Sequence, residues 1–274
     1  MPIMSETKQQ AKVTVNTFRQ MKERGEKISM LTAYDYTMAK IIDQAGVDSI
    51  LVGDSAANVM HGWPTTLPIS LDQMIWHGAA VTRAVSHALV VIDMPFGSYQ
   101  ASVEQGVNSA VRIMKETLAD AVKIEGGARV AQTIKQITQA GIPVVGHLGL
   151  TPQSVNAFGG YALRAKEQAE ADQLVADALT LQEAGCFAMV IEKVPASLAA
   201  SVSQQVTIPI IGIGAGSQVD GQVLVGQDML GMSDMFRPKF VRHYANIRQT
   251  VADAVKAYVA DVKTASFPSP EEQY

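Results

Sequence analysis

The sequence is short of cysteine, of basic segments and of long apolar runs, and each shortage excludes a class of protein. Its 274 residues include one cysteine, Cys186, so no disulfide can form within the chain. The formal net charge is −4 and no Lys/Arg-rich block is present, which argues against nucleic acid and anionic membrane as partners. No run reaches the length of a membrane span, and residues 1–10 lack the apolar core of a signal peptide. We therefore expect a cytoplasmic protein with neither nucleic acid nor membrane as a partner.

The composition is that of an ordinary globular protein. Hydrophobic residues make up 47% of the chain and charged residues 18%, which is enough apolar material for one large core. The length suits either two small domains or one α/β barrel of about 250 residues. Cys186 follows Ala184 and Gly185 at a predicted junction between helix and strand, so we expect a buried, unreactive thiol.

Short apolar runs alternate with segments of helical periodicity along most of the chain. The predicted strands cover residues 28–33, 49–52, 88–92, 121–124, 143–147, 188–191, 209–213 and 222–225. The predicted helices cover residues 14–24, 36–45, 70–84, 102–118, 128–140, 167–184, a short segment opened by Pro195, and 242–262. Asp35, Ser70 and Ser102 stand at the expected starts of three of these helices. The strands do not alternate polar with apolar residues, so both faces of the sheet are predicted to be covered.

Eight strand–helix units in succession predict an α/β fold, a (β/α)8 TIM barrel with an N-terminal helix and a C-terminal helix. We expect a helical extension at residues 1–26, a single barrel domain at 27–264 and a flexible tail at 265–274. The seventh unit is the weakest, because little helix fits between Gly216 and Gln222. A doubly wound open sheet is the alternative, but it would need a Gly-rich turn after the first strand, where residues 32–35 read Thr-Ala-Tyr-Asp.

Polar side chains follow five consecutive predicted strands. They are Asp54, Asp93, Glu125, His147 and Glu192. In a barrel these residues are neighbours at the C-terminal rim, where such folds carry their sites. Each acid alone is as well explained as a helix cap, but four carboxylates at one rim repel each other and need a counter-charge. The ligand set is rich in oxygen and has no zinc-type spacing, so we predict a Mg²⁺ or Mn²⁺ site.

Two further features belong to the same predicted rim. Lys123 lies two residues before Glu125 on one strand, so both side chains face the barrel mouth, where a lysine can hold a substrate carboxylate or phosphate. The glycines of residues 212–216 fit either a phosphate cradle or a tight turn. The long polar loop through residues 158–161, with Gly159 and Gly160, is a candidate lid.

Several blocks together resemble the ketopantoate hydroxymethyltransferase family, in register from about Lys27 to Lys239. The matching blocks are Thr32-Ala33-Tyr34-Asp35-Tyr36, Leu51-Val52-Gly53-Asp54-Ser55, Asp93-Met94-Pro95-Phe96, Val122-Lys123-Ile124-Glu125-Gly126-Gly127, Gly146-His147-Leu148-Gly149-Leu150-Thr151-Pro152-Gln153, Phe158-Gly159-Gly160-Tyr161 and Ile210-Ile211-Gly212-Ile213-Gly214-Ala215-Gly216. One departure lies at Gly226-Gln227-Asp228, where members of the family often carry a histidine before the aspartate. No site role is attached to that position.

The resemblance implies a cytoplasmic enzyme of pantothenate and coenzyme A biosynthesis, assembled as a homodecamer of stacked pentamer rings. Its reaction would transfer a hydroxymethyl group from 5,10-methylenetetrahydrofolate to the small-molecule substrate 3-methyl-2-oxobutanoate, giving 2-dehydropantoate. One Mg²⁺ per subunit would be bound by Asp54 and Asp93, with Glu125 beside the ion or bound to it through water. The keto acid would chelate that ion, which places Asp54 and Asp93 against the substrate as well.

The resemblance also implies roles for the remaining polar residues. Ser55 and Lys123 would hold the substrate, and Glu192 would be the catalytic proton acceptor. His147 lies between the acids and could hydrogen-bond Glu192 or the substrate. The C3–H bond beside the ketone is a very weak acid, so a metal on the ketone oxygen would stabilise the enolate, and a carboxylate base needs a pKa raised toward neutrality.

Two other functions remain open from the sequence. A metal-dependent C–C lyase of the phosphoenolpyruvate and isocitrate lyase type uses a similar barrel, but it usually needs a cysteine in a mobile loop, and Cys186 lies elsewhere. A catalytically silent barrel kept as an oligomeric scaffold is the other alternative, and it predicts no dependence on Mg²⁺.

Overall fold

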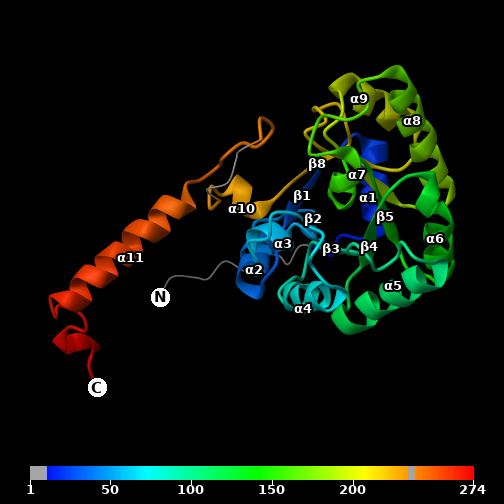
Figure 1. Ribbon diagram of the computed structural model, residues 1–274. Helices are drawn as coiled ribbons and strands as arrows, with labels where there is room; N and C mark the ends of the chain where they lie inside the picture. The colour runs from blue at the N-terminus through cyan, green and yellow to red at the C-terminus, as the bar shows by residue number, and fades with distance from the viewer. Residues whose placement is uncertain (1–10, 234–237) are drawn as a thin grey trace. The chain divides into compact units, whose positions relative to one another are not determined.

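Eight parallel strands close into a barrel in the order β1-β2-β3-β4-β5-β6-β7-β8 (Figure 1). They are β1 (Ile28–Thr32), β2 (Ser49–Val52), β3 (Leu89–Asp93), β4 (Ala121–Glu125), β5 (Val144–Gly149), β6 (Ala188–Glu192), β7 (Ile210–Ile213) and β8 (Gly221–Leu224). This computed structural model describes residues 11–233 and 238–274, so the expectation for residues 1–10 lies outside the described part. The predicted (β/α)8 barrel is confirmed.

Helices follow the strands around the outside of the barrel. They are α1 (Val15–Arg24), α2 (Tyr36–Gln44), α3 (Ala56–Val59), α4 (Leu71–Thr82), α5 (Val103–Thr117), α6 (Ala128–Gln139), α7 (Val155–Phe158), α8 (Gln168–Glu183) and α9 (Ala196–Gln205), with a 3₁₀ turn η1 at Pro152–Ser154. As the sequence indicated, no described helix separates β7 from β8. Within the described ranges, no helix is both long and apolar enough to cross a bilayer.

The chain divides into two compact units, Met1–Val225 and Gly226–Tyr274, and all eight strands belong to the first. The second unit contains α10 (Gly226–Met229), α11 (Ile247–Lys263) and a 3₁₀ turn η2 (Pro270–Glu272). Helix α11 begins five residues later than the predicted 242, at the point where the Asn246 side chain accepts a hydrogen bond from Gln249 N. The domain boundaries expected from the sequence, 1–26, 27–264 and 265–274, stay a prediction.

The predicted helix starts are correct in their capping chemistry. Asp35 accepts a hydrogen bond from Met38 N at 2.9 Å at the start of α2. Ser70 and Gln73 form a reciprocal capping box at the start of α4. Because these side chains satisfy backbone N–H groups that the first turn leaves free, they fix where each helix begins after its loop.

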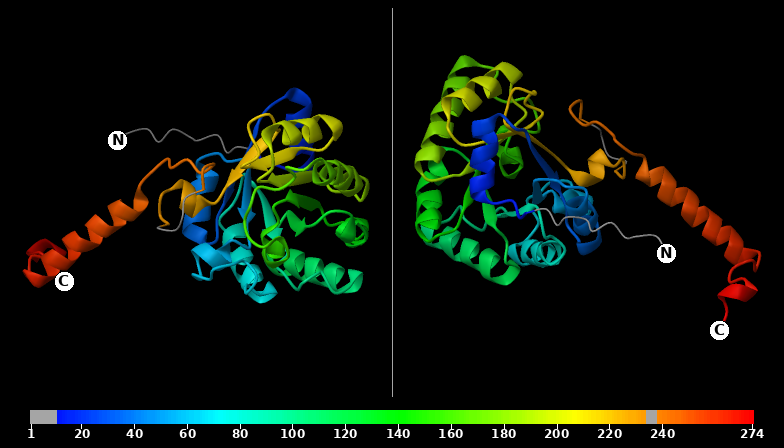
Figure 2. Two further views of the ribbon diagram at one scale, coloured as in Figure 1. Left: turned by 45° about the horizontal axis from the view of Figure 1, so that its top comes forward. Right: turned by 180° about the vertical axis from the view of Figure 1, so that it is seen from behind.

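Alternate residues of each strand enter two different apolar cores. On β3, Leu89 and Val91 belong to the core inside the barrel, whereas Val90 and Ile92 belong to the core between sheet and helices. The inner core is closed at the N-terminal end by α1 (Figure 2), and Phe18 of this helix belongs to that core. A strand with both faces buried reads as a continuous apolar run, which is why the sequence shows no alternation.

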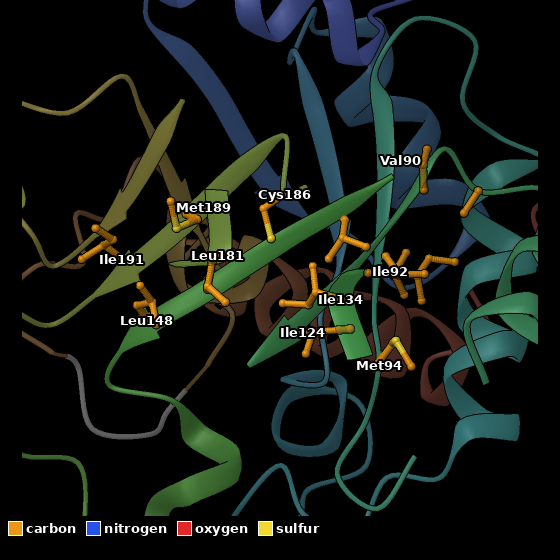
Figure 3. Packing of buried hydrophobic residues seen from close by; sticks show 14 of the residues in the cluster. Val90, Ile92, Met94, Ile124, Ile134, Leu148, Leu181, Cys186, Met189 and Ile191 are labelled. Atoms are coloured by element: carbon orange, nitrogen blue, oxygen red, sulfur yellow. The ribbon is translucent and has the colours of Figure 1, made fainter. Parts of the chain in front are cut away.

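The outer core surrounds the one cysteine of the chain (Figure 3). A methyl group at Gly146 would lie 2.9 Å from Leu181 Cδ1, 3.1 Å from Met189 Cγ and 3.4 Å from Cys186 Sγ. The glycine therefore lets α8 and β6 approach β5 closely. Burial raises the pKa of the Cys186 thiol to about 12, so the thiol stays protonated and unreactive, in agreement with the sequence-based expectation.

Asp43 is a buried acid of α2 that the sequence analysis did not single out. Its carboxylate accepts hydrogen bonds from Ser86 N at 2.8 Å, Ser86 Oγ at 3.0 Å, His87 N at 3.1 Å and Ala88 N at 2.8 Å. Burial alone would raise the pKa of Asp43, but these donors outweigh it and lower the pKa. One side chain thus holds the whole loop that leads into β3.

We expect Asp43→Ala to lower the free energy of unfolding by about 3 kcal/mol, because it leaves several backbone donors of this loop without a partner. The wild-type carboxylate has a lowered pKa in the folded state, so its contribution is full above the unfolded pKa and is lost as the pH falls through the folded value. Urea unfolding at pH 7 and pH 3 measures both effects. Exposed Asp253→Ala is the control, and equal stability of wild type and Asp43→Ala at pH 7 would contradict the assignment.

Candidate active site

Along each of the central strands, the residues that face the barrel interior are apolar at first and become polar at the C-terminal end. On β4, Ala121 faces the inner core, and Lys123 and Glu125 follow at alternate positions on the same side. The same alternation brings Asp93 on β3 and His147 on β5 to the mouth. The buried residues at the mouth are each at most 4% exposed: Asp54, Asp93, Lys123, Glu125 and His147. The structure therefore brings together the side chains that the sequence placed at one rim.

Lys123 and Asp93 are opposite each other in the register of β3 and β4. Lys123 Nζ lies 3.0 Å from Asp93 Oδ1 and 3.8 Å from Glu125 Oε1. Burial opposes the charged form of Lys123, but Asp93, Glu125 and Asp54 together raise its pKa, so the ammonium is retained. Burial raises the pKa of Asp93, and the ammonium of Lys123 limits that rise.

Asp54 lies two residues beyond β2 and is joined to β3 by its backbone. Its N–H donates to Asp93 Oδ2 at 2.9 Å, so the two acids lie side by side. Burial, together with the negative charges of Glu125 and Asp93, raises the pKa of Asp54 well above its usual range. An acid in this environment gains a great deal from a nearby cation, because the cation removes the repulsion that raises its pKa.

Glu125, His147 and Glu192 form a line of polar contacts across β4, β5 and β6. His147 Nδ1 lies 3.1 Å from Glu125 Oε1, and because a carboxylate can only accept, the imidazole donates. His147 Nε2 lies 3.5 Å from Glu192 Oε2. Burial and the neighbouring Lys123 disfavour the imidazolium, but Glu125 and Glu192 outweigh them and raise the pKa of His147 to about 9. The two carboxylates thus favour the imidazolium form although Lys123 Nζ lies 3.1 Å from Nδ1, and the contact with His147 lowers the pKa of Glu125 against the effect of burial.

Ser55 lies at the edge of the mouth, after the turn that ends β2. Its Oγ is 2.8 Å from the hydroxyl of Tyr34, a buried residue that follows β1. A methyl group at Gly53 would lie 2.7 Å from Ser55 Oγ, so a larger residue would force the Ser55 hydroxyl out of its place. The block Gly53-Asp54-Ser55 thus has a packing reason for each residue.

The family model described as ketopantoate hydroxymethyltransferase matches residues 12–270. The chain belongs to this family. It is 61% identical over 263 residues to the 3-methyl-2-oxobutanoate hydroxymethyltransferase of Bacteroides fragilis, with 96% of each chain covered. The protein of the same name from Parabacteroides distasonis is also 61% identical, again with 96% of each chain covered. The resemblance seen in the sequence is thereby confirmed.

Solved structures of other enzymes share the fold of this family member. Phosphonopyruvate hydrolase in complex with oxalate and Mg²⁺ superposes with a TM-score of 0.59 at 16% identity, covering 94% of this chain and 93% of the other. A 2,3-dimethylmalate lyase superposes with a TM-score of 0.58 at 14% identity, covering 94% and 90%. At such identities the likeness concerns the barrel alone.

The predicted metal ligands meet only in part. Within the described residues, no three His, Cys, Asp or Glu side chains converge into a set that could hold a metal ion. Asp54 and Asp93 are adjacent, whereas both oxygens of Glu125 are engaged, one by His147 Nδ1 and the other by Gln153 N at 3.0 Å. The donors that remain suit a Mg²⁺ ion held by two carboxylates, water and substrate oxygens, as hard oxygen ligands do. The metal roles stay a prediction.

Gln153 is the residue at the mouth to which sequence reasoning gave no role. Its Nε2 donates to Asp54 Oδ2 at 2.9 Å and to the Met94 carbonyl at 3.0 Å. Its Oε1 accepts from the Tyr99 hydroxyl at 2.6 Å. Gln153 was visible only as part of a matching block. No local pattern indicates that the loop after β5 turns back over the mouth.

Two other expectations have different outcomes. Gly216 has a φ of +84°, and a methyl group there would lie 2.5 Å from Ala196 Cβ, so its glycine is explained by a turn against α9. A phosphate cradle at residues 212–216 therefore gains no support. Gly159 and Gly160 have φ values of +71° and +132° in the loop proposed as a lid, and its closure stays a prediction.

We expect Lys123→Met to lower the free energy of unfolding by about 3 kcal/mol at pH 8 without metal, because it leaves Asp93 and Glu125 without their cation. The loss should shrink toward pH 5, since acids with raised pKa values then take up protons and no longer need the ammonium. Thermal unfolding in EDTA across this pH range measures the effect. Exposed Lys135→Met is the control, and a loss that grows as the pH falls would contradict the charge assignment.

Proposed function

We propose that this family member transfers a hydroxymethyl group from 5,10-methylenetetrahydrofolate to 3-methyl-2-oxobutanoate, giving 2-dehydropantoate, the committed step toward pantothenate. The observation that carries the proposal is the division of the mouth into two sides. Asp54, Asp93 and Lys123 form a charged group on one side, and Glu192 stands apart on β6, linked to the others through His147. Enolate chemistry needs an electrophilic side and a base in this separate arrangement.

The keto acid is held by the residues beside β2 and β4. Lys123 stays protonated, and its Nζ can pair with the substrate carboxylate in a site from which most water is excluded. Ser55 Oγ, oriented by the Tyr34 hydroxyl, can donate a hydrogen bond to the same anion. Both contacts would fix the ketone and its C3 carbon between Asp93 and Glu192.

Asp54 and Asp93 would hold the Mg²⁺ ion that we propose as the cofactor. The fit rests on the hard oxygen donors of the two acids, which lie side by side, and on the rise that burial gives to the pKa of each, because a bound cation would favour their ionised forms. When bound, the ion would supply Lewis-acid polarisation of the substrate ketone. Glu125 orients His147 through the hydrogen bond from Nδ1. Its position beside the ion, or bound to it through water, is part of the proposal.

Glu192 is the proposed base because it is the most accessible carboxylate of the group, with its side chain 14% exposed. The protonated His147 can donate from Nε2 toward Glu192 Oε2 and orient it toward C3. Glu192 would take the C3 proton, and the C3 carbon would then form a bond to the methylene carbon of the folate. Both bonds from that carbon to the folate nitrogens break, and water supplies the hydroxyl group. The C3 proton and one proton of the water end on the two nitrogens, so tetrahydrofolate and 2-dehydropantoate result.

The family resemblance also supports a cytoplasmic homodecamer with one Mg²⁺ per subunit, and we propose both. The lyase alternative loses its main requirement, because Cys186 is buried in the outer core and its thiol pKa is raised to about 12. A catalytically silent barrel would leave the buried charges at the mouth unexplained. Burying charged groups costs stability, and proteins keep such groups mainly where a function needs them.

We expect the protein with Mg²⁺ in D₂O to exchange the C3 proton of 3-methyl-2-oxobutanoate in the absence of folate. Glu192→Gln should slow this exchange at least a hundredfold, which is the usual contribution of a general base, and Asp54→Ala should abolish it. Proton NMR follows the loss of the C3 signal, and adding methylenetetrahydrofolate should yield 2-dehydropantoate. Exposed Glu183→Gln is the control, and no exchange by the wild type would refute the proposed reaction.

Removal of divalent ions with EDTA should abolish exchange, and Mg²⁺ should restore it. We expect Gln153→Leu to raise the Mg²⁺ concentration for half-maximal exchange about tenfold, because Gln153 orients Asp54 and such supporting residues affect metal affinity by that order. A Mg²⁺ titration of the exchange rate measures this change, and thermal unfolding checks that the variant is folded. Gln168→Leu on α8 is the control, and an unchanged Mg²⁺ requirement would show that Gln153 does not support the ion.

A further inference from the structure

A cavity of about 450 Å³ lies beside the barrel mouth and has no part in the reaction described above. Its floor is formed by Gly126 and Gly127 after β4 and by Gly149 at the end of β5, and its outer wall by the N-terminal half of α8. Phe158 of α7 and Arg164 complete it. The volume is within the range of sites that bind small molecules.

The cavity and the mouth share a wall. Gly126 follows Glu125 directly, and Gly149 is paired in register with Glu192. Leu150 N donates to the Glu192 carbonyl at 2.8 Å, and Gln153, a few residues later, contacts Asp54. A molecule seated in the cavity would therefore have one end next to the residues that carry the reaction.

The cavity combines apolar surface with two guanidinium groups. The Arg164 guanidinium stacks on the Phe158 ring at 3.9 Å and pairs with Glu170, but its Nε is buried without a hydrogen-bond partner. Arg129 Nη2 donates only to Ser154 Oγ, at 3.0 Å, and within the described residues Arg129 has no carboxylate in ion-pair range. A methyl group at Gly126 would lie 2.9 Å from Arg129 Nε, which places this guanidinium over the floor of the cavity.

The acids of the cavity are already engaged in the fold. Asp177 Oδ1 accepts from Ala128 N at 2.9 Å and from Gln173 Nε2 at 3.1 Å, so it caps α6. Glu170 pairs with Arg164 and accepts from Ala165 N at 2.7 Å. Arg129 is thus the charge that remains available to a ligand, and Arg164 contributes an unused Nε–H. An aryl group with carboxylates attached matches this combination of ring surface and guanidinium donors.

We propose that this cavity binds the p-aminobenzoylglutamate part of the folate co-substrate. The aryl ring lies against Phe158, and the glutamate carboxylates bind Arg129 and Arg164. The aryl amino nitrogen, to which the one-carbon unit is attached, then points over the shared wall to the mouth. This inference rests on the proposed function, which requires a folate but does not say where it binds. In this proposal the segment between β5 and α8 positions the folate co-substrate.

Calorimetric titration of p-aminobenzoyl-L-glutamate tests the site without turnover. We expect Arg129→Gln and Arg164→Gln each to weaken binding about tenfold or more, the effect of losing a charge-assisted hydrogen bond. Arg19→Gln on α1, a surface arginine at the other end of the barrel, should bind like the wild type. p-Aminobenzamide, which keeps the aryl amide but has no carboxylate, should bind more weakly and show no sensitivity to Arg129→Gln. Unchanged affinity in both cavity variants would overturn the proposal, as would equal competition by inorganic phosphate.

Kinetics separates this inference from the proposed reaction. In Arg129→Gln the KM for methylenetetrahydrofolate should rise about tenfold, whereas the C3 exchange, which needs no folate, should keep the wild-type rate. A fall in exchange together with the rise in KM would show that Arg129 acts on the mouth and would overturn a role confined to the folate tail. If the wild type shows no exchange at all, the proposed reaction fails, and the p-aminobenzoylglutamate titration still decides whether the cavity binds this ligand.

Discussion

One buried ammonium group makes the charged mouth of this barrel possible. Lys123 Nζ lies within 4 Å of both Asp93 and Glu125, in a region that is almost closed to solvent. Carboxylates in such a place would repel each other and take up protons unless a cation were near. His147 adds a second positive charge through its contact with Glu125. The order of these residues on neighbouring strands, acid beside base in register, is what lets the charges balance.

The position of this group follows from the alternation of side chains along a strand. On β3, Leu89 and Val91 fill the interior and Asp93 continues the same series at the mouth. On β4, Ala121 is succeeded by Lys123 and Glu125. The lower part of the barrel is therefore an apolar core closed by α1, and the upper part is a polar site built on the same rigid strands. The residues that stabilise the barrel and the residues of the candidate site therefore form successive layers of the same interior.

Much of this arrangement could be predicted from the sequence, because strands with buried faces leave apolar runs and the residue after each run is then placed at the rim. β2 was predicted at its observed bounds, Ser49–Val52, and β4 and β6 to within one residue at their ends. β5 extends to Gly149, two residues beyond the predicted end at His147, because the residues after it give little strand signal although the barrel keeps them extended.

The contacts that could not be predicted join residues far apart in the sequence. Gln153 and Asp54 are 99 positions apart, and Asp43 meets Ala88 across 45. Each of these hydrogen bonds involves a connecting segment, the loop before β3 or the turn after β5, which has no periodicity and whose direction depends on the tertiary fold. The sequence therefore showed which acids reach the mouth, but not which side chains hold them in place.

The balance of charged side chains at the barrel mouth also bears on the proposed reaction. With all its carboxyl groups ionised, the mouth carries four negative charges against the two positive charges of Lys123 and His147. The net charge of −2 is the amount that one divalent cation would neutralise. Asp54 lies at this position, where burial and the charges of Glu125 and Asp93 raise its pKa. If Asp54 and Asp93 held a cation, the ammonium of Lys123 would be available to a substrate carboxylate. The lysine that balances the acids of the mouth would then also select an anionic keto acid, so that folding and substrate recognition would depend on one side chain.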